Sequence, residues 1–141
     1  MNIPIHWRPI TVETDEAWTQ TRRLYAYLSA RGTEILYVGM TWHATVRSRW
    51  SRSGKPYFWD DLEEQRGIHA HRVLVGGLAL FPDERLTKHL LAEIESLLIH
   101  RLQPWGNIQC QRSRIVPSGL VVNCRGTSPH RLCTFRDQRW P

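Results

Sequence analysis

The strongest pattern of hydrophobic and polar positions lies between residues 82 and 104. Apolar residues recur there at helical spacing, at Leu86, Leu90, Ile94, Leu97, Leu98 and Leu102. Residues three or four positions apart share one face of an α-helix, so this face is expected to pack on a core. Pro82 and Asp83 open the predicted helix, and Pro104 ends it because proline has no backbone N–H to donate.

Three other runs are typical of β-strands. Two of them, residues 24–29 and 34–39, are joined by a short interval that contains Gly32, which predicts an antiparallel hairpin. The third run covers residues 69–81 and carries a glycine pair in its middle, which suggests a bulge or a close approach of backbones. His69 and His71 alternate in this run and so share a face. A solvated or hydrogen-bonded face is favoured there over a metal pair, because no third ligand stands at a telling spacing.

The remaining elements are shorter. Helices are predicted over residues 14–23, 41–52 and 59–65. Residues 1–13 are expected to be an irregular or strand-like lead-in, since Pro4 and Pro9 exclude a long helix. Two strand candidates, residues 120–124 and 132–135, follow near the C-terminus. The whole pattern predicts a mixed α/β chain without internal repeats.

Composition favours one soluble domain. The chain has 141 residues, of which 41% are hydrophobic and 23% charged. No apolar run approaches the roughly 18 residues of a membrane span, so no membrane partner is expected. The first ten residues lack the apolar stretch of a secretory signal, and the cysteines are three in number. A cytoplasmic protein with free thiols is therefore expected.

The charge balance points to a polyanionic partner. Nineteen Lys and Arg stand against thirteen Asp and Glu, a formal net charge of +6. Residues 108–141 alone hold six arginines and one acid, Arg112 and Arg114 among them. This stretch is either a basic surface on edge strands or a platform for the DNA backbone. No recognition helix or zinc finger is evident.

Two tyrosines, a basic segment and one carboxylate form a set suited to phosphodiester chemistry. Tyr25 and Tyr37 lie on the two hairpin strands. The segment after the hairpin is basic, with Arg47, Arg49, Arg52 and Lys55. Glu95 lies among apolar positions of the long helix, and its i+4 neighbour, Ile99, is not a base. A carboxylate suits Mg²⁺ or Mn²⁺, and a guanidinium suits phosphate oxygens. A tyrosine near a metal or an arginine can have its pKa lowered enough to accept a proton from water.

These residues also stand in a recognisable order. Leu24-Tyr25 and Tyr37-Val38-Gly39 are followed by the arginine-rich segment, in which Arg49 has the fitting apolar neighbours and Arg47 is the second choice. Glu95 is followed nine residues later by Pro104, and three residues after that by Asn107. The ordered set resembles the GIY-YIG nuclease superfamily over residues 23–107. Three positions depart from it: Arg23 replaces the glycine of the first motif, the interval between the tyrosines is one residue longer than is typical, and Ser53 stands where some members carry histidine.

The resemblance implies a fold, an activity and a set of site residues. The fold is a small antiparallel central sheet flanked by helices, here with a C-terminal β-rich extension. Residues 1–22 would be a lead-in with a short helix, 23–107 the nuclease core, and 108–141 a basic extension of the same domain. The catalytic residues implied are Tyr25, Tyr37, Arg49, Glu95 and Asn107. Glu95 would also bind Mg²⁺ or Mn²⁺.

The implied function is a divalent-metal-dependent endonuclease acting on DNA, with RNA not excluded. Tyr25 would act as general base or position the water, and Asn107 would order the site. Further contacts to nucleic acid are expected from Arg47, Arg52, Lys55, Arg112 and Arg114. Each residue also has a plainer interpretation, since strand tyrosines are commonly half-buried and helix arginines commonly solvated. The alternative function is a domain of the same fold that binds nucleic acid without cutting it. The sequence leaves strandedness and oligomeric state open.

Overall fold

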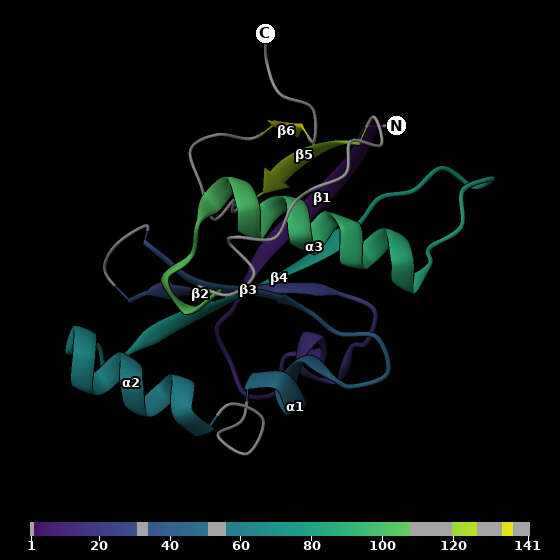
Figure 1. Cartoon of the computed structure of the whole chain (residues 1–141). Helices are drawn as coiled ribbons and strands as arrows, with labels where there is room; N and C mark the ends of the chain where they lie inside the picture. The colour runs from purple at the N-terminus through teal and green to yellow at the C-terminus, as the bar shows by residue number, and fades with distance from the viewer. Residues whose placement is uncertain (1, 31–33, 51–55, 108–119, 127–133, 137–141) are drawn as a thin grey trace, which may run out of the picture.

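The computed structural model describes residues 2–30, 34–50, 56–107, 120–126 and 134–136. Over these residues the chain forms one curled sheet of six strands with three α-helices (Figure 1). The strands are β1 (Asn2–Ile10), β2 (Leu24–Ser29), β3 (Ile35–Met40), β4 (His71–Leu78), β5 (Val121–Gly126) and β6 (Thr134–Arg136). The helices are α1 (Val46–Trp50), α2 (Pro56–Arg66) and α3 (Lys88–Leu102), with 3-10 turns η1 (Glu16–Thr19) and η2 (Trp105–Asn107). The strand order is β3-β2-β4-β1-β5-β6.

The N-terminal segment is an interior strand of this sheet rather than a lead-in. β1 pairs antiparallel with β4 and parallel with β5. Ile3, Ile5 and Trp7 alternate into the core, which is why the segment is held as a strand. Pro4 and Pro9 exclude a helix here, but a proline still offers its carbonyl: Pro4 O accepts from the backbone N of Ala79 at 2.9 Å.

β2 and β3 form the hairpin that the sequence predicts, with one irregularity. Tyr27 lies opposite Tyr37, but the register then shifts so that Leu28 lies opposite Ile35. Leu36 is therefore an extra residue in β3. This bulge turns Ile35 toward one face of the sheet, while Leu36 and Tyr37 lie on the other. Because the bulge accommodates the additional residue between Tyr25 and Tyr37, Tyr37 still lies on the same face of the sheet as Tyr27.

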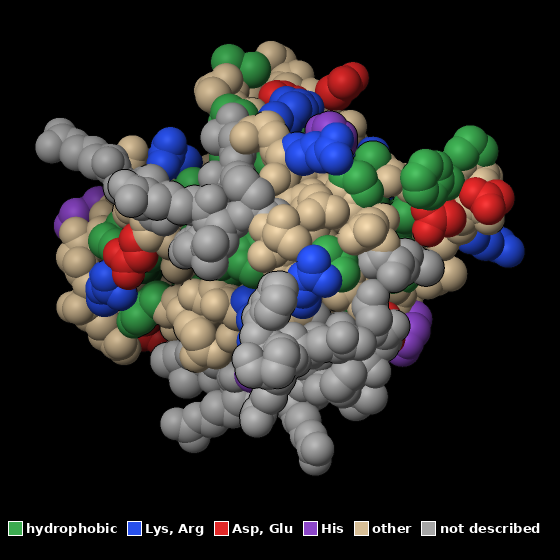
Figure 2. Space-filling model, turned by 90° about the horizontal axis from the view of Figure 1, so that it is seen from above, with side chains coloured by type: hydrophobic (Ala, Val, Ile, Leu, Met, Phe, Trp, Pro, Cys, Tyr) green, Lys and Arg blue, Asp and Glu red, His purple; other side chains and the backbone are tan. Residues whose placement is uncertain are grey.

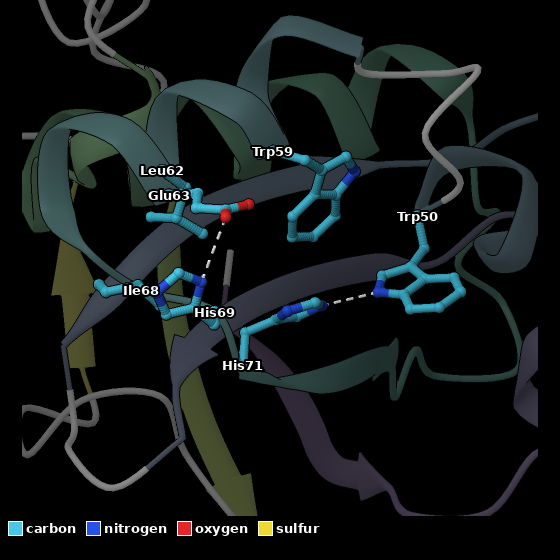
Figure 3. A pocket seen from close by; sticks show the side chains of 7 residues that line it. All are labelled: Trp50, Trp59, Leu62, Glu63, Ile68, His69 and His71. Atoms are coloured by element: carbon cyan, nitrogen blue, oxygen red, sulfur yellow. Dashed lines mark hydrogen bonds and ion pairs between the residues drawn. The ribbon is translucent and has the colours of Figure 1, made fainter.

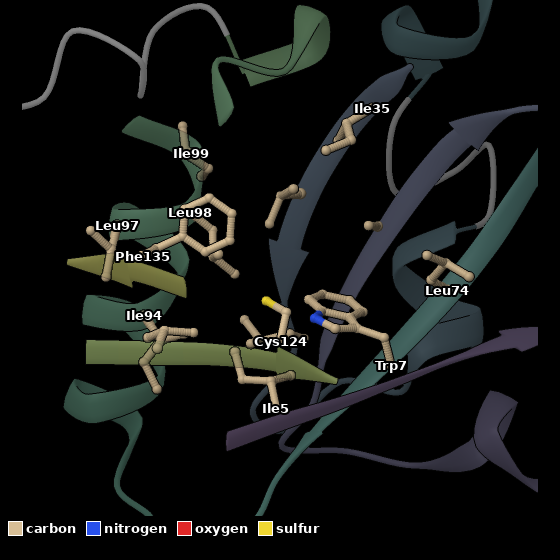
Figure 4. Packing of buried hydrophobic residues seen from close by; sticks show 14 of the residues in the cluster. Ile5, Trp7, Ile35, Leu74, Ile94, Leu97, Leu98, Ile99, Cys124 and Phe135 are labelled. Carbon is tan, nitrogen blue, oxygen red and sulfur yellow. The ribbon is translucent and has the colours of Figure 1, made fainter. Parts of the chain in front are cut away.

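α3 covers one face of the sheet. Its buried side chains are Leu91, Ile94, Leu97, Leu98 and Ile99. They pack with side chains of β1, β5 and β6, including Trp7, Cys124 and Phe135 (Figure 4). Gly76 of β4 lets β1 approach closely, since a Cβ there would lie 2.9 Å from Ile5 Cγ2 and 3.0 Å from the Trp7 ring. The strands that precede and follow residues 23–107 thus pack into the same apolar cluster as the long helix.

The opposite face is covered by α1, α2 and η1 (Figure 1). Val46 of α1 and Leu62 of α2 are buried against Tyr25 and Tyr27 of β2. α1 is anchored at its start, where the backbone N of Val46 donates to Gln20 O at 3.1 Å. This face is unusually aromatic, and it is the face on which the tyrosines of the hairpin lie.

Several element boundaries differ from those that the sequence predicts. The helix expected over 14–23 is only the short turn η1, capped by the Asp15 carboxylate, and Arg22 then adopts a left-handed conformation that ends any helix. Of the helix expected over 41–52, the described residues 46–50 form α1, residues 41–45 are not helical, and residues 51 and 52 lie outside the described residues. The long helix begins at Lys88 rather than near Pro82, because the Thr87 side chain accepts from the Leu90 N–H and caps it there.

The fold class is confirmed in its coarse form as mixed α/β, with helices on both faces of the sheet. The sheet is largely but not wholly antiparallel, since β1 and β5 run parallel. β5 and β6 continue the sheet beyond β1. Within the described residues, no helix has both the length and the apolar character needed to cross a membrane.

Candidate functional site

The site is centred on Tyr25, whose ring crosses the hairpin. Tyr25 on β2 lies opposite Gly39 on β3. A Cβ at position 39 would lie 2.4 Å from both the Cζ and the Oη of Tyr25. The phenol therefore lies directly over the Gly39 backbone, in space that any larger residue would fill. The glycine of Tyr37-Val38-Gly39 thus has a local reason: it admits the ring of the other motif tyrosine.

A third tyrosine, not selected from the sequence, completes the cluster. The ring centroids of Tyr25, Tyr27 and Tyr37 lie 5.3 to 6.0 Å apart, with interplanar angles of 19° to 36°. Tyr25 and Tyr27 are buried, whereas Tyr37 is half-buried. The i, i+2 spacing on a predicted strand was the signal available for Tyr27, since it places Tyr25 and Tyr27 on one face.

The structure separates the two candidate arginines. Arg47 donates to Glu13 O at 2.9 Å, and its guanidinium lies 5.1 Å from the Trp18 ring centroid. Arg49, on the same short helix, places its positive charge within electrostatic reach of Tyr25 and Tyr27, and lowers the pKa of both. Arg47 is thus engaged with the segment around η1, and Arg49 is the arginine that acts on the tyrosine cluster.

The charge of Glu95 also acts on Tyr25. Glu95 lies half-buried on α3, and its negative charge raises the pKa of Tyr25. α1 and α3 pack on opposite faces, so Arg49 and Glu95 act on Tyr25 from different layers of the molecule. Tyr37 stacks on Tyr25, with ring centroids 6.0 Å apart, and the charges of Arg49 and Glu95 both act on Tyr25, although the four residues are spread over positions 25–95 of the sequence.

Asn107 holds the outer strand of the hairpin. It is buried in η2, where its Oδ1 accepts from the Val38 N–H and its Nδ2 donates to Val38 O, each at 2.9 Å. β3 is an edge of the sheet, and the amide of Asn107 satisfies the two backbone groups that a further strand would bind. Asn107 therefore holds in place the strand that carries Tyr37 and Gly39.

The pKa of Tyr25 moves opposite to the sequence-based expectation. Burial raises it well above the ordinary value for tyrosine; the neighbouring Tyr27 and Tyr37 raise it further, and so does Glu95. Arg49 alone opposes the shift. The pKa of Tyr27 is likewise raised, first by burial. The expectation of a lowered pKa considered the charged partners and not the loss of solvent, which is the larger effect.

The side chains around Tyr25 fit a divalent cation held mainly by water and substrate. Among the described residues no group of three or more His, Cys, Asp or Glu side chains could hold a metal ion. The carboxylate assigned to the site is that of Glu95. Mg²⁺ keeps several waters and takes one or two carboxylates together with phosphate oxygens of a substrate. One half-buried carboxylate beside a phenol fits such a cation, and does not fit a fully protein-ligated ion such as structural zinc.

Four predicted contact residues, Arg52, Lys55, Arg112 and Arg114, lie outside the described residues. On the face seen in Figure 2, the Lys and Arg side chains of the described residues are scattered among acidic and apolar ones. Comparisons of the chain with protein-family models, with curated proteins and with solved structures each find no match. The likeness to GIY-YIG nucleases therefore stays a prediction carried by the motif residues themselves.

Proposed function

We propose that this chain is a divalent-metal-dependent endonuclease that hydrolyses phosphodiester bonds in DNA. The observation that carries the proposal is that the charges of Arg49 and Glu95 both act on Tyr25, which stacks on Tyr37. A cation, a carboxylate and a phenol at one point are the groups that phosphoryl transfer to water needs, because charge must be balanced on the phosphate while the attacking water is held in line.

The residues divide the work by their chemistry. Arg49 stabilises negative charge on the phosphoryl oxygens with a planar, permanently charged donor set. Tyr25 orients the attacking water by hydrogen bonding; as a phenolate it would also take up the proton, which Arg49 favours and burial opposes. Tyr37, half-buried beside it, supports the phosphate or the Tyr25 hydroxyl. Asn107 keeps both tyrosines in register through Val38.

Glu95 is the residue that would hold Mg²⁺ or Mn²⁺. When bound, such a cation polarises the scissile phosphate and steadies the leaving oxygen. The half-exposed carboxylate leaves room for the waters and phosphate oxygens that a hard cation requires. Arg47 and the basic residues at 52, 55, 112 and 114 are proposed to contact the nucleic-acid backbone.

A nicking assay tests the proposal. Supercoiled plasmid and labelled single-stranded DNA are incubated with Mg²⁺, Mn²⁺ or EDTA. We expect metal-dependent cleavage that falls by about 100-fold or more in Tyr25→Phe and in Glu95→Gln. Two matched controls keep wild-type cleavage: Tyr57→Phe, since Tyr57 is 81% exposed, and Glu93→Gln, since Glu93 pairs with the exposed His89 on the surface of α3. Cleavage that survives Glu95→Gln contradicts the assigned site, and the absence of metal-dependent cleavage of any DNA or RNA contradicts the proposal.

The raised pKa of Tyr25 favours one second candidate, a domain that binds nucleic acid without cutting it. A buried, protonated phenol is a poor proton acceptor at neutral pH. In that case salt-sensitive binding persists without turnover, and Glu95→Gln leaves affinity unchanged. The nicking assay and a filter-binding titration of the same preparations therefore decide between the two.

A further inference from the structure

A pocket of about 420 Å³ lies on the aromatic face of the sheet, outside the catalytic cluster. The described residues that line it are Trp50, Trp59, Leu62, Glu63, Ile68, His69 and His71. Figure 3 shows the Trp59 and His71 rings in the middle, with Trp50 on one side and the Glu63–His69 pair on the other. Its volume falls within the range of small-molecule pockets, roughly 300–1,000 Å³.

The rings of this pocket are held in fixed orientations. The indole Nε1 of Trp50 donates to Nε2 of His71 at 2.7 Å. Because an indole N–H only donates, His71 accepts on Nε2 and carries its proton on Nδ1. Trp59 lies 4.4 Å from the His71 ring centroid and 6.4 Å from that of Trp50. Burial lowers the pKa of His71, so the ring is neutral at physiological pH and offers a π face rather than a charge.

The pocket is joined to the tyrosine cluster by one shared ring. Tyr27 packs against Tyr25 at 5.3 Å and against Trp59 and His71 at 5.2 and 5.7 Å. A ligand in the pocket is therefore separated from the Tyr25 ring by a single aromatic side chain. This spacing suits a polymeric substrate in which a flat ring lies next to the reacting phosphate.

The mouth of the pocket carries the polar groups. His69 Nδ1 lies 3.4 Å from Glu63 Oε1, and both side chains are more than half exposed. A carboxylate accepts hydrogen bonds through two oxygens, so Glu63 can accept from a ligand while it faces His69. Leu62 and Ile68 supply the apolar part of the wall. Flat π faces inside and an acceptor at the mouth match a nucleobase with an exocyclic amino group.

We propose that this pocket binds one unpaired nucleobase of the nucleic-acid substrate, stacked on Trp59 with an edge toward Trp50, whose ring is inclined at 69° to that of Trp59. The proposal rests on the proposed nuclease function for its substrate, and it names the form of that substrate: a single strand, a flap or a frayed end beside the cleaved bond. A base stacked in a duplex has no free face for the indoles, so duplex DNA binds less tightly. Glu63 favours adenine, cytosine and guanine over thymine, which has no amino group to donate.

Binding is measured without metal, so that the result does not depend on cleavage. The protein is titrated in EDTA with dAMP, dCMP, dTMP and deoxyribose 5-phosphate, and quenching of indole fluorescence is followed at the red edge of the indole band. A single-stranded oligonucleotide with one 2-aminopurine is titrated next, alone and annealed to its complement. We expect quenching by dAMP and dCMP, weaker quenching by dTMP, none by the sugar phosphate, and tighter binding of the single strand.

The variant Trp59→Leu keeps an apolar side chain and removes the stacking face. It is expected to weaken single-strand binding by roughly 5- to 150-fold, whereas Trp59→Phe restores most of it. The matched control is Trp42→Leu. Trp42 packs against the apolar cluster that α3 covers, and the Arg22 guanidinium lies over its ring, so it is not part of the wall of this pocket. Thermal melts of all variants exclude those that do not fold, and Glu63→Gln tests the preference for amino-bearing bases on an intact pocket.

The outcomes separate this inference from the nuclease proposal. Nucleotide binding that Trp59→Leu abolishes, in a protein that cuts nothing, supports the pocket and overturns the nuclease. Metal-dependent cleavage with equal binding of single strand and duplex, unchanged in Trp59→Leu, supports the nuclease and overturns the pocket. Binding of tetramethylammonium in place of nucleotides also overturns it, because the rings would then be a cation site.

Discussion

At the scale of single residues, the candidate site depends on the position of the Tyr25 ring. Tyr25 is buried over Gly39, and its pKa is lowered by the charge of Arg49 and raised by that of Glu95. The motif residues were predictable from their order in the sequence. The sign of the Tyr25 pKa shift could not be predicted in this way. It depends first on burial and then on the neighbouring Tyr27 and Tyr37, and this environment exists only when the hairpin is packed under α1 and α2.

Gly39→Ala is the residue-scale test of this arrangement. The new Cβ would lie 2.4 Å from the Tyr25 ring, so the phenol or the strand must shift. We expect a loss of stability of about 1–3 kcal/mol from overpacking and a loss of cleavage of about 100-fold from misplaced catalytic groups. Urea unfolding and the nicking assay measure the two effects.

Gly77→Ala is the matched control for that substitution. A Cβ at Gly77 would lie 3.7 Å from Arg23 Nε, an ordinary contact, so both stability and cleavage should stay close to wild type. Equal effects of the two substitutions would show that glycine as such, and not the path of the Tyr25 ring, matters at position 39.

At the scale of elements, patterns of residues predict strands and long helices better than short ones. β2 coincides with the predicted run, in which the strand formers Tyr25 and Tyr27 alternate, and α3 follows its repeat of leucines. The helix predicted over 14–23 is too long and the one predicted over 59–65 too short, since η1 spans Glu16–Thr19 and α2 spans Pro56–Arg66. The start of α1 is also late, because α1 is held by packing and a backbone hydrogen bond rather than by periodicity. The bulge at Leu36 had no local signal, because it is set by which side chains the two faces of the sheet can bury.

Asn107 offers the element-scale prediction. Asn107→Ala removes both hydrogen bonds to Val38 and leaves two buried backbone groups of an edge strand unsatisfied. We expect a destabilisation of about 2–4 kcal/mol and a loss of hydrogen-exchange protection at the Val38 amide. Amide exchange followed by NMR, together with urea unfolding, measures these effects.

Asn107→Asp sharpens the same test. The carboxylate still accepts from the Val38 N–H but faces Val38 O with no proton to donate, so it should be no more stable than Asn107→Ala. Asn123→Ala is the control, since the Asn123 side chain makes an exposed bond to Thr134 at 3.0 Å. Retention of Val38 protection in Asn107→Ala would contradict the role assigned to Asn107 in holding β3.

At the scale of the whole molecule, the resemblance covers residues 23–107, but the sheet does not stop at its limits. β1 lies between β4 and β5, and its side chains share one core with α3 and β6. The sequence predicts an irregular or strand-like lead-in over residues 1–13, because two prolines exclude a long helix, and it does not place this segment inside the sheet. The alternation of Ile3, Ile5 and Trp7 becomes decisive only when β4 and β5 are there to flank it. The N-terminal strand, the core and the described strands of the tail therefore form one unit.

A buried substitution far from the site tests that unity. Ile5 is fully buried in β1, outside the resemblance, and Ile5→Ala should cost about 2–5 kcal/mol. Because β1 joins β4 to β5, the loss should appear in a single urea transition, with tryptophan fluorescence and far-UV circular dichroism coinciding. Val12→Ala is the control, since Val12 is 56% exposed and its substitution should change stability by less than about 0.5 kcal/mol. Two separate transitions in Ile5→Ala would mean that residues 23–107 fold without the N-terminal strand, and the sheet would then be a nuclease-like core with strands added to it rather than one cooperative structure.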